Sequence, residues 1–575
     1  MSSRLPRQRW HFPQPNPQLV REISRNCGIS PIMAQVIVNR GVTDLSSAHY
    51  YINPEQAQLP HPLQEFPHLS HCIDIVKQAI AKGEKIGICG DYDADGMTST
   101  ALLIRTLRHL GGIVDYAIPS RMKDGYGINE RLVNEFHQQG FSLIITVDNG
   151  ISAHPAIERA KELGLKVIIT DHHDLPPTLP PADAILNPKL LPETSPYHCL
   201  AGVGVAYIFA ISLAQSFGPL NGLTKGLLEL YTIGTIADLV PLNGVNRRWL
   251  KRGLKLLANP DILGIRALSK CAGINESKTL LNTDDIGFIL GPRINAIGRL
   301  DDPQIVIELL TTEEEEVAME MAKKCEYTNR RRQEMCNVIE EEAVAIIERK
   351  PFLWQENRVI FLVNKKWHHG VIGIVASRLV ERYGVPVFLA TYEDEKGDYI
   401  RGSARGIEEY NVFSALQYCD DLLEKYGGHK AAGGFTFSSK KLELFHQRLI
   451  EFSLANIKPE HTKPLIKIDA QISLYQANLQ LLREIESLYP WGVENKHPIF
   501  CSKKVKIKQQ RITKDGQHLQ LIVADETGEK KAIAWRWHPY FPLPPEVDIA
   551  YKIKEDEWQG NNSIQLELVG VRLPS

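Results

Sequence analysis

The stretch KIGICGDYDADG (residues 85–96) decides the fold of this 575-residue chain, because an apolar run ends there in three aspartates. The arrangement recurs three times. LIITV (143–147) ends at Asp148, VIIT (167–170) leads into the histidine pair His172 and His173, and YTIGTIA (231–237) is followed by Asp238. β-Branched runs that alternate with helical stretches are typical of βαβ units. The sequence therefore predicts an α/β domain with a parallel sheet.

The acidic and histidine side chains are expected to meet at one edge of that sheet. Ligands of open parallel sheets lie beyond the carboxyl ends of the strands, where neighbouring loops converge. Carboxylates with one or two imidazoles and no thiolates suit Mn²⁺ or Mg²⁺ better than structural zinc. Two such ions, about 3.5–4 Å apart, can activate a water for phosphoryl hydrolysis. Any single aspartate is more often a turn or cap residue, but four clusters together indicate a metal site.

Composition narrows the class of protein. The chain is 43% hydrophobic and 23% charged, which is typical of a soluble globular protein, and its length predicts three or four domains. No apolar run approaches the ~20 residues that cross a bilayer, and the first residues lack the apolar segment of a signal peptide. The nine cysteines form no Cys-x-x-Cys pair, so a cytoplasmic location is expected. A net charge of −2 neither favours nor excludes nucleic-acid binding, which depends on local patches.

Changes of pattern along the chain predict five segments. Residues 1–55 form an N-terminal extension that is expected to pack on the first domain, the α/β region of residues 56–310. Residues 311–350 contain no Gly or Pro, and are predicted to form one or two long linking helices that end at Pro351. A second α/β unit covers 351–455. Short alternating segments within 460–575 predict a small β-barrel of the oligonucleotide-binding kind, with a β-sandwich as the alternative.

Three basic segments flanked by glycine are predicted to be phosphate-binding loops: GPRINAIGR (291–299), RGSARG (401–406) and GGHKAAGG (427–434). The arginine fork matches phosphate oxygens, and glycine lets a phosphate reach main-chain N–H groups. Ordinary surface turns are the alternative. In addition, WHHG (367–370) precedes an apolar helix whose N-terminus favours an anion. A buried, hydrogen-bonded side chain is the alternative for at least one of the two histidines.

A row of basic residues marks the first long segment of the β-rich tail, and two tryptophans follow in sequence. Lysines that alternate along a strand, together with aromatic rings, suit single-stranded nucleic acid. A solvated edge strand protected by lysines explains the same residues equally well. The residues concerned are Lys503, Lys504, Lys506, Lys508, Arg511, Trp535 and Trp537.

Together these motifs resemble the RecJ branch of the DHH phosphoesterase superfamily, over roughly residues 50–575. The resemblance implies the fold class: a parallel-sheet DHH domain, a long helical linker, a smaller α/β DHHA1 domain and an OB-like β-barrel. The DHH domain is indicated by DYDADGMTS, VDNGIS, TDHH, ADLVPL and GPRINAIGR, the DHHA1 domain by WHHGVIGIVASRL, GSARG and GGHKAAGGF, and the OB domain by PWGVENKHPIF and the β-rich tail.

The resemblance implies a metal-dependent 5′→3′ exonuclease that hydrolyses single-stranded DNA to 5′-mononucleotides in recombination and repair. Two Mn²⁺ or Mg²⁺ ions would share Asp148 as the bridging carboxylate, and Asp91 and His173 would assist. Many relatives outside the RecJ branch have a histidine where this chain has Cys89, so the composition of one metal shell stays open. The implied metal ligands are Asp93, Asp95, Asp148, His172 and Asp238, all of them catalytic together with His173. The implied phosphate-binding residues are Arg293, Asn295, Arg299, His369, Ser403, Arg405 and His429.

The expected substrate is single-stranded DNA with a 5′ end, and RecJ-like enzymes work beside a helicase and a single-strand-binding protein. We expect a monomer that contacts no membrane. Two other functions stay open. A phosphodiesterase of the same superfamily, acting on small nucleotides or nanoRNA, would usually lack the β-rich tail. A non-catalytic DNA-binding scaffold would have lost acidic motifs that this chain retains.

Overall fold

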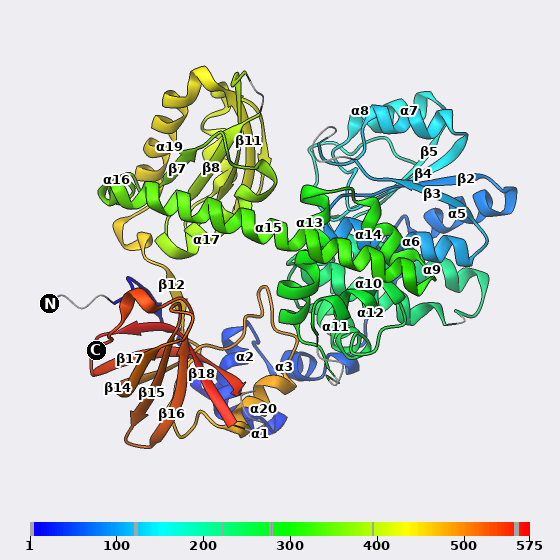
Figure 1. The fold of residues 1–575 in the computed structure, drawn as a ribbon. Helices are drawn as coiled ribbons and strands as arrows, with labels where there is room; N and C mark the ends of the chain where they lie inside the picture. Colours follow the sequence, from blue (N-terminus) through cyan, green and yellow to red (C-terminus); the bar gives the residue numbers. More distant parts are fainter. Residues whose placement is uncertain are drawn as a thin grey trace. The chain divides into compact units, whose positions relative to one another are not determined.

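The computed structural model describes residues 5–119, 125–220, 222–274, 278, 280–393, 396–556 and 563–574. The chain forms two compact units (Figure 1). We call the first, which comprises His49–Arg331 and Leu488–Lys496, the parallel-sheet unit. The second, which we call the sheet-and-barrel unit, comprises Met1–Ala48, Arg332–Ser487 and His497–Ser575.

The parallel-sheet unit is built on five parallel strands in the order β3-β2-β4-β5-β6. Three of them, β2 (Lys85–Cys89), β4 (Phe141–Val147) and β5 (Lys166–Thr170), are the apolar runs predicted as strands. Neighbouring residues of β4 face opposite sides and both are buried, as in Ile144 and Ile145. Burial on both faces is typical of parallel sheets covered by helices, so the predicted parallel sheet is confirmed. The flanking strands are β3 (Ile113–Ala117) and β6 (Ala184–Leu186).

Helices cover both faces of this sheet (Figure 1). On one face lie α7 (Glu130–Gln138) and α8 (His154–Glu162), which contact β4 and β5. On the other lie α6 (Ala94–His109) and α9 (Gly202–Phe217). Further helices of the unit are α4 (Pro62–Glu65), α5 (Leu69–Lys82), α11 (Gly244–Leu256), α12 (Leu263–Cys271) and α14 (Gln304–Thr311), and α3 (Leu45–Ile52) begins in the other unit and ends in this one.

The fourth apolar run, 231–237, is helical rather than extended. It forms the last turns of α10 (Leu223–Ala237), and Asp238 is the C-cap. Leu227, Leu230 and Ile233 are fully buried at helical spacing, so the run is one face of a longer apolar helix. The prediction of a strand failed because a short β-branched run cannot be distinguished from part of a buried helix.

The segment 291–299 is also a helix and not a loop, which corrects the first predicted phosphate loop. It forms α13 (Gly291–Leu300) and follows a π-helix, η3 (Asp285–Leu290). The helix runs on from η3 into α13 without a break, so Pro292 stands inside it and donates no N–H to the preceding π-helical turn. The two glycines serve close packing, since a Cβ added at Gly298 would lie 1.7 Å from the Tyr92 carbonyl oxygen.

The predicted linking helix is confirmed as one helix, α15 (Glu315–Arg349). Its residues as far as Arg331 belong to the parallel-sheet unit, and those from Arg332 onward belong to the other. Pro351 follows at once and begins a short helix, α16 (Pro351–Asn357).

The sheet-and-barrel unit contains a five-stranded mixed sheet in the order β10-β11-β9-β8-β7. The second predicted loop, 401–406, lies almost entirely in a strand of this sheet, β9 (Tyr399–Arg405). The third, 427–434, is a hairpin of β10 (Leu423–Gly428) and β11 (Ala432–Ser438). Glycine marks close packing here too, since a Cβ added at Gly402 would lie 2.1 Å from the Phe435 ring. The other elements are β7 (Ile360–Val363), β8 (Val387–Tyr392), α17 (His369–Tyr383), α18 (Val412–Gln417) and α19 (Leu442–Asn456).

The β-rich tail forms a closed five-stranded barrel, as predicted, and not a sandwich. The order β14-β15-β16-β18-β17 is closed by a pairing between β14 and β17. β14 pairs with β17 in its first half and with β15 in its second, and Lys503, Lys504 and Lys508 lie where the register of these pairings shifts. The strands are β14 (Phe500–Ile512), β15 (Leu519–Asp525), β16 (Gly528–Ala534), β17 (Glu546–Asp556) and β18 (Ser563–Arg572), joined by the short β13 (Ala470–Gln471), and α20 (Leu479–Ser487) packs nearby.

The N-terminal residues pack with the barrel, which corrects the prediction that they cover the first domain. β1 (Arg9–His11) pairs in parallel with β12 (Leu465–Lys467). Behind it follow α1 (Pro17–Cys27) and α2 (Pro31–Asn39). Both carboxylate oxygens of Asp469 accept hydrogen bonds from the Arg40 guanidinium, at 2.5 and 3.0 Å. A contact between residues so far apart in sequence leaves no local pattern.

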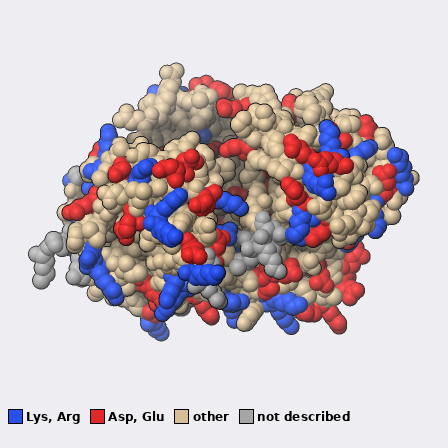
Figure 2. All heavy atoms as spheres, turned by 90° about the horizontal axis from the view of Figure 1, so that it is seen from above, with Lys and Arg blue, Asp and Glu red and all other residues tan. Residues whose placement is uncertain are grey.

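None of the described helices combines the length and apolarity needed to cross a bilayer. Acidic and basic side chains are interspersed on the face that Figure 2 shows, in keeping with the net charge of −2.

Candidate metal centre

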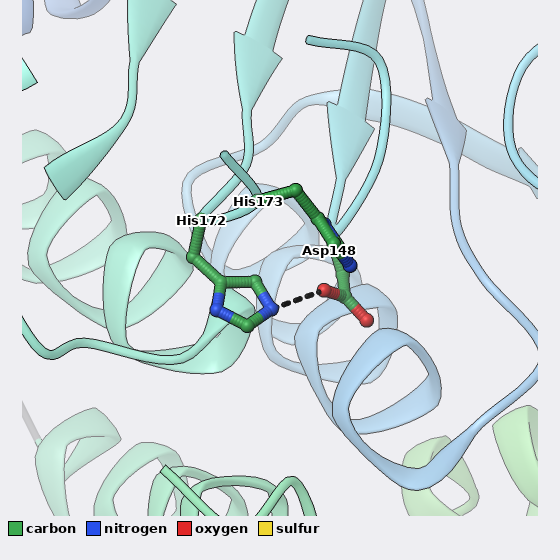
Figure 3. Close-up of side chains that lie close together, drawn as sticks. All are labelled: Asp148, His172 and His173. Carbon is green, nitrogen blue, oxygen red and sulfur yellow. Dashed lines mark ion pairs between the residues drawn. The ribbon is translucent and has the colours of Figure 1, made fainter. Parts of the chain in front are cut away.

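Three strand ends and one helix end bring the predicted metal ligands together. His172, just beyond β5, lies at the centre of the group. Its Nε2 atom is 3.1 Å from Asp148 Oδ1, the pair shown in Figure 3, 3.7 Å from Asp238 Oδ2 and 3.8 Å from Asp95 Oδ2. Residues from four separate parts of the chain therefore share one site at the carboxyl edge of the sheet, as the strand pattern predicted.

The ligand atoms form three overlapping groups, each with its atoms within 4.8 Å of one another. Asp148 and His172 each belong to two of the groups. A shared carboxylate is what two neighbouring cations require, so the geometry fits a bridging Asp148. The groups are Asp148 with His172 and His173, Asp95 with His172 and Asp238, and Asp91 with Asp93 and Asp148.

Backbone N–H groups hold two of the carboxylates in place. Asp93 is the N-cap of α6, where its Oδ1 accepts from the N–H groups of Asp95 and Gly96 at 3.0 and 3.1 Å. Both oxygens of Asp95 accept from the first N–H groups of α9, those of Gly202 at 2.7 Å and Val203 at 2.8 Å. Two helix N-termini, which favour negative charge, thus point into the site. A Cβ added at Gly202 would lie 2.7 Å from Asp148 Cβ, so this close approach depends on glycine.

Asp148 adopts an unusual backbone conformation. Its φ is 60°, in the left-handed region that few residues other than glycine occupy, although aspartate tolerates it best with asparagine. The turn is held by Asn149, whose amide donates to the carbonyls of Cys89 and Val147 at 3.0 and 2.9 Å. Leu239, directly after Asp238, also has a positive φ, of 63°. Strained residues of this kind cluster at functional sites.

The charge of the cluster is poorly compensated by the protein. Burial, reinforced by Asp93, raises the pKa of Asp95 to about 7. Burial and the neighbouring aspartates raise the pKa of Asp148 and of Asp238 well above the usual range. Among the described residues, no Lys or Arg forms an ion pair with these three carboxylates. Asp148 Oδ1 is buried and accepts no hydrogen bond from any described residue.

Divalent cations would supply the missing charge, and the donor set fits them. Oxygen atoms and an imidazole suit Mn²⁺ or Mg²⁺. Cys89 does not change this assignment. It is fully buried at the end of β2, and none of the three groups of candidate ligands among the described residues includes it.

A second group of polar contacts supports the histidines. Asp171 Oδ1 accepts from His173 Nδ1 at 2.7 Å, and Asp171 Oδ2 accepts from the Ile151 N–H at 2.9 Å. Burial alone would raise the pKa of Asp171, but the hydrogen bond and charge of His173 outweigh it and lower that pKa. Burial would likewise lower the pKa of His173, and the bond to Asp171 raises it instead.

The hydroxyl of Tyr126 completes this group. It donates to the backbone carbonyl of Asp148 at 2.5 Å and lies 3.2 Å from His173 Nε2. Neither Asp171 nor Tyr126 is among the site residues predicted from the sequence. The signal for the first was its place beside the two histidines, and for the second its place between two glycines, Gly125 and Gly127.

Helix α13 contacts the first turn of α6, which carries two of the predicted ligands. Asn295 Oδ1 accepts from the Ala94 N–H at 2.9 Å, at the start of α6 and between the aspartates at 93 and 95. Arg293 Nε lies 2.7 Å from Glu326 Oε2 of α15, and its Nη1 donates to the Ile289 carbonyl at 2.7 Å. Arg299 lies four residues beyond Asn295 on the same helix. The structure thus shows supporting contacts for Asn295 and Arg293, whereas phosphate binding by α13 stays a prediction.

The remaining predicted phosphate residues lie in the mixed sheet and its helix. His369 is the first residue of α17, and His368 caps that helix by accepting from the Gly370 N–H at 3.1 Å. Ser403 and Arg405 face α17 from β9, since a Cβ added at Gly373 would lie 3.4 Å from Ser403 Oγ and 3.1 Å from an Arg405 guanidinium nitrogen. His429 is exposed in the turn between β10 and β11, and β11 is the strand that pairs with β9.

Family models and relatives agree with this arrangement. The model described as the DHH family N-terminal domain matches residues 85–235, the DHHA1 domain matches 356–453 and the RecJ OB domain matches 468–570. The single-stranded-DNA-specific exonuclease RecJ of Bacillus subtilis is 36% identical over 562 residues, which cover 97% of this chain and 70% of that protein. The chain belongs to the RecJ family. RecJ of Escherichia coli is 32% identical over 563 residues, 94% of this chain and 95% of that one.

Solved RecJ structures share the fold. RecJ from Thermus thermophilus in complex with Mn²⁺ superposes with a TM-score of 0.83 at 29% identity, over 99% of this chain and 80% of that one. A second RecJ, bound to manganese, gives a TM-score of 0.60 at 32% identity, over 70% of this chain and 98% of that one. The resemblance drawn from the sequence motifs is therefore confirmed, as is the predicted fold class.

Proposed function

We propose that the chain is a metal-dependent exonuclease that hydrolyses single-stranded DNA from its 5′ end and releases 5′-mononucleotides. The observation that carries the proposal is the acidic cluster around His172, complete in a member of the RecJ family. Its relatives are named single-stranded-DNA-specific exonucleases. The direction of attack and the product follow from the resemblance of the motifs, and are part of the proposal.

The cluster would hold two Mn²⁺ or Mg²⁺ ions. When bound, the ions supply an activated water and neutralise the charge that develops on the phosphate. Both metals occur in structures of the Thermus relative. Asp148 would bridge the two sites, Asp91 would support them, and His173, held by Asp171, would face the scissile phosphate. The direct ligands would be Asp93, Asp95, Asp148, His172 and Asp238.

The strand would be held through its phosphates and bases. The amide nitrogen of Asn295 could donate to a phosphate while its oxygen holds α6, and a phosphate at Arg293 would share the guanidinium with Glu326. The closed barrel would hold the downstream strand by charge and stacking. The other residues proposed to bind phosphate are Arg299, His369, Ser403, Arg405 and His429.

We further propose that the protein acts in the cytoplasm, as a monomer, in recombination and repair beside a helicase and a single-strand-binding protein. The presence of the barrel disfavours a phosphodiesterase for small nucleotides, because such enzymes usually lack it. The intact acidic cluster disfavours a non-catalytic scaffold, because such a scaffold would have lost metal ligands.

One experiment tests the activity. A single-stranded oligonucleotide labelled at either end, and its duplex, are incubated with the protein and Mn²⁺, Mg²⁺ or a chelator. With metal, we expect the single strand labelled at its 5′ end to release a labelled mononucleotide at once, and the strand labelled at its 3′ end not to do so. We expect no release in the presence of the chelator and none from the blunt duplex. No product from either end would overturn the proposal. Cleavage of only very short oligomers would favour a small-nucleotide phosphodiesterase.

Asp148→Asn tests the metal assignment. Asparagine tolerates the left-handed backbone of this position, so the variant loses charge without losing the turn. We expect turnover to fall by roughly three orders of magnitude or more, while binding of the oligonucleotide stays measurable by fluorescence anisotropy. Asp115→Asn, an exposed aspartate on β3, is the matched control. Wild-type turnover in Asp148→Asn would mean that this residue holds no catalytic metal.

A further inference from the structure

Tyr126 is oriented against the usual preference of tyrosine. A tyrosine at a protein surface normally buries its ring and leaves its hydroxyl in water. Here the hydroxyl points inward, to the Asp148 carbonyl at 2.5 Å and to His173 Nε2 at 3.2 Å. The residue as a whole is nevertheless 51% exposed, so its ring is the part that faces outward. An apolar surface is thereby presented next to the metal ligands.

The loop around Tyr126 enforces this orientation. Gly125 and Gly127 both adopt left-handed conformations, with φ of 85° and 71°. The Asn149 side chain, which also shapes the turn after Asp148, accepts from the Ile128 N–H at 3.0 Å. A Cβ added at Gly127 would lie 3.1 Å from Asn149 Cβ. The tyrosine is therefore attached directly to the turn that carries Asp148.

The ring is one of four aromatic rings in a continuous row beside the cluster. Tyr92, from the loop before α6, meets Tyr126 edge to face at 6.3 Å between centroids. Tyr126 meets His173 at 5.5 Å, and His173 meets His172 at 4.6 Å. Two rings of this row belong to histidines of the candidate metal centre, so a group lying along Tyr126 would lie next to the site proposed for the scissile phosphate.

From this arrangement we infer that the ring of Tyr126 contacts the base of a nucleotide adjoining the scissile phosphate, and makes cleavage depend on that base. The inference rests on the proposed exonuclease function. Aromatic rings stack on any base with little preference for its identity, so the contact would require a base and accept all four. The hydroxyl acts separately as a positioning group for His173 and the Asp148 turn.

Two variants separate these roles. Tyr126→Phe keeps the ring and removes the hydroxyl, whereas Tyr126→Leu keeps apolar bulk and removes the ring. Tyr50→Leu is the matched control, because Tyr50 lies in the same unit and is 50% exposed. Thermal melting and Mn²⁺ binding, followed by calorimetry, show whether each variant is folded and loads metal.

The substrates are single-stranded oligonucleotides with an intact sequence, or with an abasic residue at the first, the second or the eighth position from the 5′ end. For the wild type we expect release of the first nucleotide to slow by at least about fivefold when the abasic residue is at position one or two, and to be unchanged when it is at position eight. Tyr126→Phe and Tyr50→Leu should keep this ratio. Tyr126→Leu should cleave intact and abasic substrates at rates equal within about twofold.

The outcomes distinguish the two proposals. If the wild type releases no nucleotide from the intact oligonucleotide, the exonuclease function itself is wrong. If it cleaves intact and abasic substrates equally, or if Tyr126→Leu keeps the wild-type ratio, the exonuclease can stand and the base contact is overturned. Should Tyr126→Leu fail to fold, the wild-type and Tyr126→Phe ratios still decide, because a ratio near one in both contradicts the base contact.

Discussion

At the scale of the single residue, two opposing influences act on the pKa of the Asp95 carboxyl group. Two helix N–H groups stabilise its carboxylate, yet burial and Asp93 raise its pKa to about 7. A buried acid whose pKa is raised binds its proton more tightly in the folded state than in the unfolded state. Its contribution to the stability of the metal-free protein is therefore lost as the pH rises from about 4 through about 7.

The resulting prediction concerns pH and metal. After chelation, the melting temperature should fall between about pH 4 and about pH 7, because Asp95 must carry an uncompensated charge at the higher pH. Added Mn²⁺ should raise the melting temperature more at the higher pH than at the lower, since the ligands must be deprotonated to bind. Asp95→Asn should weaken both trends. A metal-free melting temperature that rises with pH over this range would contradict the assignment.

At the scale of secondary structure, the start of α6 depends on α13. Asn295 Oδ1 takes the N–H of Ala94, between Asp93 and Asp95, so α13 helps to place two proposed ligands. The sequence motif suggested a phosphate loop because arginine, asparagine and glycine are common in such loops. Only the helix geometry shows that one of these side chains also holds the helix that carries the proposed metal ligands.

Asn295→Ala is predicted to raise the Mn²⁺ concentration for half-maximal activity by several-fold, with a loss of roughly 1 kcal/mol in stability. The measurement is a metal titration of turnover at saturating oligonucleotide. Asn411→Ala is the matched control, because the Asn411 side chain likewise accepts an N–H in the first turn of a helix, that of Ser414 in α18 at 3.1 Å, far along the chain from the ligands. An increase in the KM for DNA with an unchanged metal requirement would instead assign Asn295 to phosphate binding alone.

The barrel strand β14 carries a second element-scale prediction. Lys503, Lys504, Lys506 and Lys508 are all exposed on this strand, and their charge serves either DNA binding or the protection of an exposed strand. Charge that serves DNA binding should show in the salt dependence of affinity.

Replacing these four lysines by glutamine should weaken binding of a long single strand by at least about tenfold and flatten the salt dependence of its dissociation constant. The release of one nucleotide from bound substrate should change little. Binding is followed by anisotropy at several salt concentrations. The same exchange at Lys82, Lys161, Lys255 and Lys270, in the parallel-sheet unit, serves as the control. Equal affinity in the two variants would remove the barrel from the DNA-binding proposal.

At the scale of the whole molecule, the two compact units are not continuous stretches of sequence, although the order of the motifs suggests one domain after another. Residues 488–496 follow α20 and precede β14, yet they belong to the parallel-sheet unit. Buried Arg247 donates to the carbonyls of Leu488 at 2.7 Å and Pro490 at 3.3 Å, and its guanidinium stacks 4.0 Å from the Tyr51 ring centroid. Deleting the tail from residue 460 would thus damage both units, and cannot test the barrel alone.

Arg247→Lys is predicted to destabilise the parallel-sheet unit by roughly 2–3 kcal/mol, because lysine cannot replace the planar fork that serves several carbonyls at once. Limited proteolysis should cut the variant within or near 488–496 faster than the wild type. Arg252→Lys on the same helix, α11, is the control. Equal cleavage rates for the two variants would mean that this arginine does not hold the segment.

The sequence by itself determined the parallel sheet, the long linking helix, the five barrel strands and the convergence of the acidic motifs. Strand and helix patterns are local, and the carboxyl ends of parallel strands necessarily meet at one edge. Even there it failed at Asp238, which α10 and not a strand delivers to the site.

Only the tertiary structure decided how those residues are supported. Hydrogen bonds join Gly202 with Asp95, Asn295 with the first turn of α6, and Tyr126 with the backbone of Asp148. No repeating pattern in the sequence connects the two segments in any of these pairs. The same is true of the N-terminal residues, which pair with β12 although the two segments lie far apart along the chain. Such contacts form where segments that are distant in sequence pack closely together. One glycine or one side-chain amide is enough to make the contact, and a single residue produces no periodic pattern in the sequence.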